Sequence, residues 1–288
     1  MRQVVSWLAW PALLGGSLLA TGFGAAHDQP LLAFYVTYPL LAAALLLLER
    51  WMPHEAAWSP GDGQGLTDVM HTLASNATIQ ILLVFSAAIG FSALATADGP
   101  PGGIWPHTWP MTAQIVLGLV ASEFALYWAH RIAHQWQPLW YFHAIHHSPV
   151  KLWVINSGRF HCVDAIKSVL PGLALLVAMG APMPVLTWLS AIGAYVGVLA
   201  HCNVAMRFGV LSRLFNTPEL HRWHHSRDLA EGNMNYGENI MVWDWVFGTW
   251  FNAARRPPAD IGIADPMPPR FRDQVAWPFR ALASRTRS

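Results

Sequence analysis

Residues 130–147 read HRIAHQWQPLWYFHAIHH, and residues 221–225 read HRWHH. These two stretches hold eight of the chain's 14 histidines, in three boxes with the spacings H-x-x-x-H, H-x-x-H-H and again H-x-x-H-H. Positions three and four apart lie on one face of a helix, so each box directs its imidazoles to one side. Crowding so many half-polar rings is costly unless something satisfies their ring nitrogens. Because neutral imidazole is the commonest protein metal ligand, the boxes predict a metal centre.

The predicted ligands are the eight box histidines, together with His201 at the end of an apolar stretch and His161 as a weaker candidate. The box residues are His130, His134, His143, His146, His147, His221, His224 and His225. So many nitrogen donors exceed the four that one tetrahedral zinc takes, so two metal ions are expected. Imidazole suits zinc, copper, iron and nickel alike, and the spacing alone does not name the element. The H-E-x-x-H motif of zinc proteases is absent from the sequence.

Composition places these boxes in a membrane protein. The chain has 288 residues, of which 54% are hydrophobic and 11% charged, against about 25% charged in a typical soluble domain. Apolar runs near the length of a bilayer helix lie at about 4–23, 31–49, 79–97, 111–129, 166–180 and 184–201. The fifth run is short and contains Pro171, so a re-entrant hairpin with the sixth is an alternative. The predicted fold is an all-α polytopic bundle of about four to six spans, with a cytoplasmic helical cap that holds the metal site.

The basic residues predict the orientation of this bundle. With a cytoplasmic N-terminus and six crossings, the far-side loops at about 24–30, 98–110 and 181–183 contain no Lys or Arg. All 17 Lys and Arg residues then lie on the cytoplasmic side or at its membrane edge. The same topology places the three boxes, the metal site and the C-terminus on the cytoplasmic face. The sequence shows no basic patch interleaved with aromatic residues, so a nucleic-acid partner is not expected.

The remaining chain divides into three expected parts. These are a transmembrane scaffold at 1–110, a catalytic region at 111–252 and a loosely ordered, Pro/Arg-rich cytoplasmic tail at 253–288. Residues 52–70 form a Gly- and Pro-bearing connector, and the isolated His54 and His71 are expected at the surface or the membrane interface. Cys162 and Cys202 lack C-x-x-C spacing and lie on the predicted cytoplasmic side, so neither a disulfide nor a thiolate ligand is expected.

One acidic residue lies inside a predicted span. Glu123 precedes His130 by seven residues, two turns along the same helix face, and an intramembrane carboxylate is a functional candidate by default. Two roles remain open for it. It either orients a ligand imidazole or pairs with Arg131 or Arg159.

The segment after the third box is expected to close over the site. Residues 227–250 read RDLAEGNMNYGENIMVWDWVFGTW and are interpreted as a helix or turn lying at the interface. Asn233, Asn235 and Asp244 are candidates to orient metal ligands, although turn chemistry explains the two asparagines nearly as well. Asp164 is expected to orient Arg159 or His161.

These motifs resemble the fatty acid hydroxylase/sterol desaturase superfamily of membrane di-iron, histidine-box enzymes. The matching stretches are 123–134 (EFALYWAHRIAH), 140–148 (WYFHAIHHS), His201, 217–225 (TPELHRWHH), 235–238 (NYGE), 243–244 (WD) and 247–249 (FGT). The similarity covers about 111–250, and the short gap from His134 to His143 is more typical of this superfamily than of acyl-chain desaturases. The resemblance implies a non-haem centre of two histidine-bound iron ions, with Glu123, Asn235 and Asp244 tuning or orienting the ligands.

The resemblance also implies an activity and its partners. We expect an O2-dependent hydroxylase (monooxygenase) that oxidises a C–H bond of a fatty acyl, sphingolipid or sterol-like substrate entering from the bilayer. Desaturation on the same centre is the nearest alternative. The sequence contains no haem-attachment, ferredoxin or dinucleotide-binding motif, so an external donor, a small haem or iron–sulfur carrier with its reductase, is expected to supply the electrons. A zinc-dependent membrane hydrolase stays open, whereas a metal transporter is disfavoured because only Glu123 is acidic within the spans.

Overall fold

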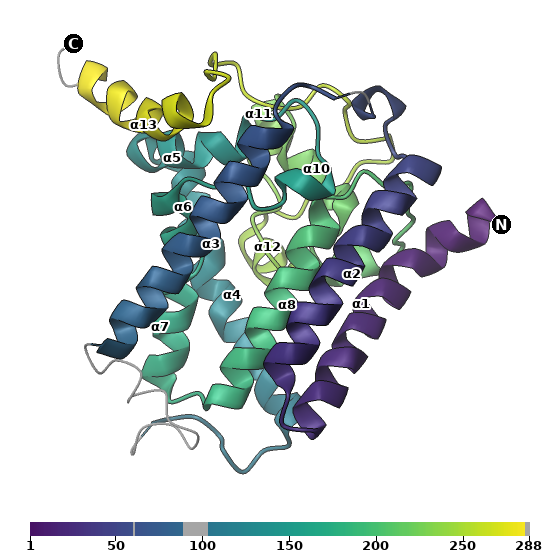
Figure 1. Ribbon diagram of the computed structural model, residues 1–288, viewed down its shortest axis with the longest axis vertical. Helices are drawn as coiled ribbons and strands as arrows, with labels where there is room; N and C mark the ends of the chain where they lie inside the picture. The colour runs from purple at the N-terminus through teal and green to yellow at the C-terminus, as the bar shows by residue number, and fades with distance from the viewer. Residues whose placement is uncertain (60, 89–102, 286–288) are drawn as a thin grey trace.

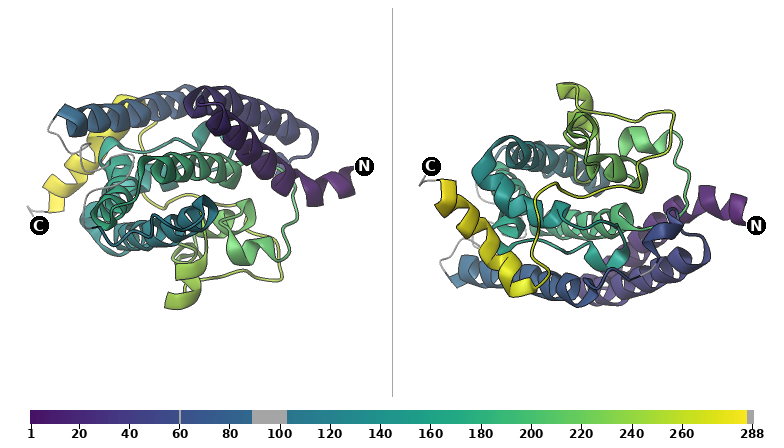
Figure 2. Two further views of the ribbon diagram at one scale, coloured as in Figure 1. Left: turned by 90° about the horizontal axis from the view of Figure 1, so that it is seen from below. Right: turned by 90° about the horizontal axis from the view of Figure 1, so that it is seen from above.

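The computed structural model describes residues 1–59, 61–88 and 103–285, and within those ranges every regular element is a helix. The helices of the bundle are α1 (Arg2–Ala26), α2 (Pro30–Trp51), α3 (Gly65–Ala88), α4 (Met111–Gln135), α7 (Leu170–Met179) and α8 (Met183–His201). They run side by side along the long axis of the molecule (Figure 1). Viewed along that axis, α1 to α3 form one face, α7 and α8 lie in the middle, and α4 forms the opposite face (Figure 2). The predicted all-α bundle is confirmed.

Five helical stretches in the described part of the chain are long and apolar enough to cross a membrane. They are Arg2–Ala26, Pro30–Trp51, Met111–Gln135, Cys162–Met179 and Met183–His201. Large apolar side chains on the outer helices face away from the bundle, such as Leu19 with 77% of its surface exposed and Leu47 with 68%. Such surfaces are stable in lipid, so the chain is an integral membrane protein. The predicted span 79–97 lies partly outside the described residues.

The stretch Cys162–Met179, which corresponds to the fifth apolar run of the sequence, is interrupted. It consists of α6 (Cys162–Lys167) and α7, which are separated by Ser168 and Val169. Pro171 lies in the first turn of α7, where a missing N–H breaks no helical hydrogen bond. Gly180 adopts a left-handed conformation, with φ of 88°, and ends α7 before the turn into α8.

Most of the remaining helices gather at one end of the bundle, where the C-terminus also lies (Figure 1). They include α5 (Gln137–His147), α10 (Pro218–His224), α11 (Leu229–Gly232) and α13 (Phe271–Arg285), while α12 (Val242–Phe247) packs along α4. Two further elements, η3 (Val154–Asn156) and α9 (Leu211–Leu214), lie in the connections. This end of the molecule corresponds to the predicted helical cap.

Three sequence-based expectations are wrong at this end. Residues 65–70 belong to α3 rather than to a connector, and His71 is buried, with 1% of its surface exposed. His71 Nε2 lies 2.9 Å from Gln274 Oε1. The tail is helical over Phe271–Arg285 and packs on α3 and α5. The contacts that bury His71 and order the tail join residues about 200 positions apart, so no local sequence pattern reveals them.

Candidate metal centre

Nine of the ten predicted ligands lie in two groups, within each of which the candidate ligand atoms lie within 4.8 Å of one another. The first histidine group contains His130, His134, His143, His147 and His224, from α4, α5 and α10. The second histidine group contains His146, His201, His221 and His225, from α5, α8, α10 and the residue that follows α10. All are buried except His134, which is half-buried.

Within each group, Nε2 atoms from different rings face one another. In the first group, His130 Nε2 lies 3.0 Å from His143 Nε2 and 2.9 Å from His224 Nε2. In the second group, His221 Nε2 lies 3.2 Å from His201 Nε2 and 3.1 Å from His225 Nε2. A neutral imidazole has one N–H and one lone pair, so converging rings cannot satisfy one another fully. A shared metal ion accepts all the lone pairs at once, so the donor sets fit two metal ions.

The electrostatics keep these rings in the form that binds metal. Burial lowers the pKa of His224 to about 3, and burial together with neighbouring imidazoles lowers the pKa values of His221 and His225 well below the usual value. Burial also lowers the pKa of His143, although Asp164 opposes that effect. The rings are therefore neutral near pH 7, as metal ligation requires.

His161 lies outside both groups. Its Nδ1 accepts a hydrogen bond from the backbone N–H of Val163 at 3.1 Å, capping α6, and its Nε2 donates to the Val275 carbonyl at 3.3 Å. Both ring nitrogens are thus engaged by the protein. The structure gives His161 a role in joining α6 to α13 instead of a place among the candidate ligands.

Backbone carbonyls orient two rings of the first group. His130 Nδ1 donates to the Tyr236 carbonyl at 2.8 Å, and His224 Nδ1 donates to the Met234 carbonyl at 2.8 Å. A carbonyl oxygen only accepts, so the proton of each ring lies on Nδ1 and the lone pair of Nε2 faces the centre. The sequence shows no sign of these contacts, because every residue carries a carbonyl group.

Side-chain oxygens orient two more rings. His143 Nδ1 lies 3.0 Å from Asp164 Oδ2, and Asp164 Oδ1 lies 3.0 Å from Lys167 Nζ. His134 Nδ1 lies 3.2 Å from Asn233 Oδ1. The prediction that Asp164 orients Arg159 or His161 is therefore wrong, whereas Asn233 does contact a candidate ligand. The i,i+3 spacing of Asp164 and Lys167 in an apolar stretch was the sequence signal for this pair.

Asp244 holds the loop that carries the two orienting carbonyls. It is fully buried, and its carboxylate accepts hydrogen bonds from the backbone N–H groups of Tyr236 and Gly237, at 2.8 and 2.7 Å, and from Thr249 Oγ1 at 2.7 Å. Asp244 thus acts on His130 through the backbone, without touching an imidazole.

Asn235 stabilises the same loop from its other side. It has a left-handed backbone, with φ of 57°, which asparagine tolerates better than most residues. Its side chain donates to the Phe251 carbonyl at 2.8 Å and accepts from the Phe251 N–H at 2.8 Å. Asn235 therefore ties the loop to the chain beyond α12.

Glu123 is also bound to this loop. Its fully buried carboxylate accepts from the backbone N–H groups of Glu238 and Asn239, the latter at 3.0 Å, and from Asn239 Nδ2 at 2.9 Å. Neither role predicted for Glu123 matches these contacts, because Arg131 instead donates to Tyr127 Oη and Arg159 contacts other groups. Backbone N–H groups in the interior of a protein need hydrogen-bond partners when no helix supplies them, and Glu123 is that partner for this loop.

The segment that follows packs against α4. Trp243 Nε1 donates to the Val120 carbonyl at 2.9 Å, and the Trp243 ring contacts Phe124. Val120 precedes His130 by ten residues on α4, which corresponds to about 15 Å along a helix. The chain after the third box therefore runs from the metal centre along α4 towards the middle of the bundle.

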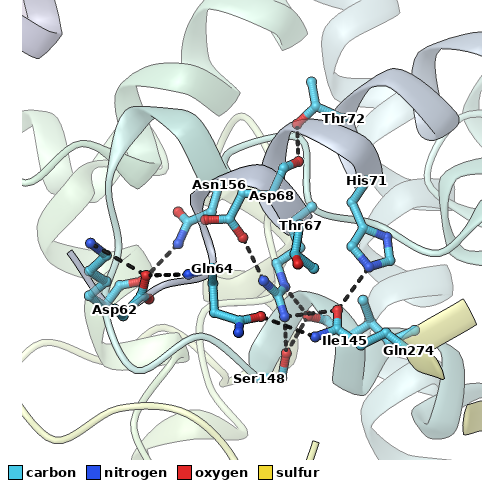
Figure 3. A network of polar contacts seen from close by, with 12 residues as sticks. Asp62, Gln64, Thr67, Asp68, His71, Thr72, Ile145, Ser148, Asn156 and Gln274 are labelled. Atoms are coloured by element: carbon cyan, nitrogen blue, oxygen red, sulfur yellow. Dashed lines mark hydrogen bonds and ion pairs between the residues drawn. The ribbon is translucent and has the colours of Figure 1, made fainter. Parts of the chain in front are cut away.

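A buried ion pair supports the helix that bears the second box. Arg159 donates to Asp68 Oδ1 at 2.5 Å and to Gln274 Oε1 at 2.9 Å. It also donates to the Ile145 carbonyl and to Ser148 Oγ, both at 3.2 Å, on either side of His146 and His147. Figure 3 shows Asp68 of α3, Ser148 just after α5 and Gln274 of α13 converging on this point. Arg159 thereby links α3 and α13 to the end of α5.

Comparisons with known proteins agree with the site. The family model for fatty acid hydroxylase matches residues 115–249. The ornithine lipid hydroxylase OlsE of Rhizobium tropici is 47% identical over 97% of this chain and 85% of its own length. The human alkylglycerol monooxygenase is 29% identical over 51% of this chain and 32% of its own length. The methylsterol monooxygenase 2-2 of Arabidopsis thaliana is 25% identical over 60% of this chain and 64% of its own length.

No solved structure matches the chain. The similarity to the Rhizobium protein extends over nearly the whole sequence, and the family model covers the stretch from α4 to the end of α12 that carries all three boxes. The chain therefore belongs to the fatty acid hydroxylase family and is an oxidoreductase of the membrane.

Proposed function

We propose that this protein hydroxylates a C–H bond of a membrane lipid at a centre of two iron ions, one held by each histidine group. The observation that carries the proposal is the pairing of two buried groups of neutral imidazoles. They meet where the rings of His147 and His225 stack, with centroids 4.3 Å apart. When bound, the two irons would supply the reduction of O2 and the oxidation of the C–H bond.

The protein's own residues perform the remaining tasks in this proposal. The Nε2 atoms present lone pairs to the metals, and the carbonyls of Met234 and Tyr236 fix the ring orientation. Glu123 and Asp244 hold the loop that bears those carbonyls. Burial of the rings keeps bulk water away from the centre, which limits loss of oxidising equivalents to side reactions.

We infer the substrate class from the relative whose similarity extends over nearly the whole chain. The Rhizobium relative is named an ornithine lipid hydroxylase and aligns over nearly the whole chain. We therefore propose an ornithine lipid, or a closely similar aminoacyl lipid, as the substrate. Such a lipid would enter sideways from the bilayer, because the spans around the centre present apolar surfaces to it.

The orientation and the partners form part of the same proposal. The one-sided distribution of Lys and Arg supports a metal centre and C-terminus on the cytoplasmic face. We propose that a small haem or iron–sulfur carrier with its reductase delivers two electrons there. We also propose that 111–252 is the catalytic region and 1–110 its scaffold, with 253–288 as a cytoplasmic extension that contributes Gln274 to the support of α5.

Desaturation is the second candidate, because a Δ7-sterol 5(6)-desaturase of Gibberella zeae is 27% identical over 63% of this chain. Both reactions begin with removal of a hydrogen atom from carbon. Oxygen transfer then gives an alcohol, whereas removal of a second hydrogen gives an alkene.

Isotope labelling of the product tests the proposal. The protein would be produced in cells that make ornithine lipids, supplied with 18-O2, and the lipids compared with those of cells carrying His143→Ala. We expect one labelled oxygen atom in the lipid, lost in the variant, and two irons per purified chain. His107→Ala, which alters an exposed histidine, is the control. An unlabelled alkene would establish a desaturase, and zinc with an O2-independent product would establish a hydrolase.

A further inference from the structure

We propose that the two histidine groups bind metal unequally: the first histidine group holds its ion tightly, and the second holds an ion that exchanges. The inference rests on the proposed function, which assigns both groups as metal sites. It concerns the ring nitrogens that face away from each centre.

Four rings of the first group have a hydrogen-bond acceptor on that outer nitrogen. The acceptors are the Tyr236 and Met234 carbonyls, Asp164 Oδ2 and Asn233 Oδ1, at 2.8 to 3.2 Å. Such acceptors fix the ring orientation and increase the basicity of the ligating nitrogen. The strongest of them is Asp164, because a carboxylate bears charge.

Among the described residues, one ring of the second group has a hydrogen-bond acceptor of this kind. Its His201 Nδ1 donates to the Gly197 carbonyl at 3.2 Å. The Nδ1 atoms of His221 and His225 are buried and have no hydrogen-bond partner among the described residues, although the Nε2 atoms of both rings face the centre. The Nδ1 atom of His146 is likewise buried without a partner in the described chain. Its ring is held by stacking on Phe160, with centroids 4.4 Å apart.

Burial alone would predict that the first group loses its metal ion before the second group does. Every ring of the second group is buried, whereas the first group includes the half-buried His134. If access of water or of a chelator decided which ion left first, the first group would lose its ion first. If the outer hydrogen bonds decide, the second group loses its ion first, so the order of loss separates the two explanations.

The expected difference is at least tenfold in affinity, because loss of one outer partner typically costs about 10- to 100-fold. The test uses iron-loaded protein in mild detergent without O2, treated with increasing amounts of a ferrous chelator. We expect the iron content to fall from two ions per chain to a plateau at one, and then to fall further at a chelator concentration at least about tenfold higher.

Variants assign the plateau to a group. His221→Ala should contain one ion that resists the chelator, whereas His224→Ala should lose the resistant ion. In Asp164→Asn the resistant ion should leave at a lower chelator concentration, so the plateau should be shorter. The concentration at which the first ion leaves should not change. Asp265→Asn, at an exposed position, is the matched control and should behave like the parent protein.

The outcomes are distinct. Loss of both ions in one step, or a plateau that survives Asp164→Asn and disappears in His221→Ala, would overturn the inference but not the proposed function. Protein with no iron that depends on these histidines would overturn the proposed function itself. If His221→Ala does not fold, judged by gel filtration, the titrations of the parent and Asp164→Asn proteins still decide between the two explanations.

Discussion

His146 and His147 are adjacent in the chain, yet their rings belong to different histidine groups, with centroids 5.4 Å apart and planes inclined at 79°. Successive residues of an α-helix point about 100° apart, so one short helix can serve two centres. The same division separates His224 from His225 at the end of α10. The second and third boxes therefore each supply candidate ligands to both groups.

Single substitutions in the second box should remove one metal ion each. We expect His147→Ala to lose the ion of the first histidine group and His146→Ala that of the second, because each ring contributes to one group. Activity should fall to background in both. Metal content per chain, measured alongside that of His107→Ala, checks this. Equal loss of both ions in either variant would mean that the two sites bind metal cooperatively.

Arg159→Lys should destabilise the helix that bears the second box. A lysine keeps the charge but cannot maintain the contacts of Arg159 with Asp68, Gln274, Ile145 and Ser148 together. We expect a loss of about 2 kcal/mol in unfolding free energy, since breaking buried ion pairs completely costs about 3–5 kcal/mol. Thermal unfolding in detergent measures the effect. Arg280→Lys, on the exposed side of α13, should leave the unfolding free energy nearly unchanged. A similar loss in that variant would show that any Arg-to-Lys substitution has this effect, whatever the contacts of the arginine.

Glu123→Ala should loosen the loop around residues 234–239. The variant leaves the buried N–H groups of Glu238 and Asn239 without an acceptor, at a cost of about 1–3 kcal/mol for each group. Glu123→Gln retains a carbonyl acceptor and should lose less. Unfolding temperature and iron content should be highest in the parent protein, lower in Glu123→Gln and lowest in Glu123→Ala. An Ala variant as stable as the parent would show that the loop is held without Glu123.

Lys167→Met should impair the orientation of His143. Its ammonium group lies 3.0 Å from Asp164, and its removal leaves that buried carboxylate without a cation. We expect destabilisation of about 3 kcal/mol, with Lys167→Arg restoring most of it. Spectra of the cobalt-substituted protein should shift in the Met variant and return in the Arg variant. A Met variant that is destabilised with unchanged spectra would restrict Lys167 to a purely structural role.

Acid should destabilise the metal-free protein. Burial lowers the pKa of His224 to about 3 from a usual value near 6.5, and those of His221 and His225 also fall. The unfolded chain therefore binds more protons than the folded one below about pH 6.5, and stability decreases as pH falls through that range. Unfolding temperatures at pH 7.5 and 5.5 measure the effect. The unfolding temperature of His224→Ala should decrease less between pH 7.5 and 5.5 than that of the parent protein. An equal decrease would show that His224 does not contribute to the acid sensitivity.

Local patterns in the sequence determined the class of fold and most of the candidate ligands. Apolar runs of bilayer length predicted the spans that end at His130 and His201, because the ability of a helix to cross a bilayer depends on the hydrophobicity and length of that segment. Spacings of three and four predicted that each box would gather its imidazoles on one helix face. These properties belong to single segments, so they can be read without the rest of the chain.

Only the tertiary structure decided how the imidazoles divide and what supports them. Helices α4, α5, α8 and α10 cross so that each group takes rings from three of them, and His161 is engaged elsewhere by Val163 and Val275. Glu123 binds backbone N–H groups 115 positions away instead of an imidazole or an arginine. Backbone groups are identical along the chain, and a buried carboxylate takes whichever donors packing brings to it. The physical reason is therefore that hydrogen-bond satisfaction depends on which segments meet in space.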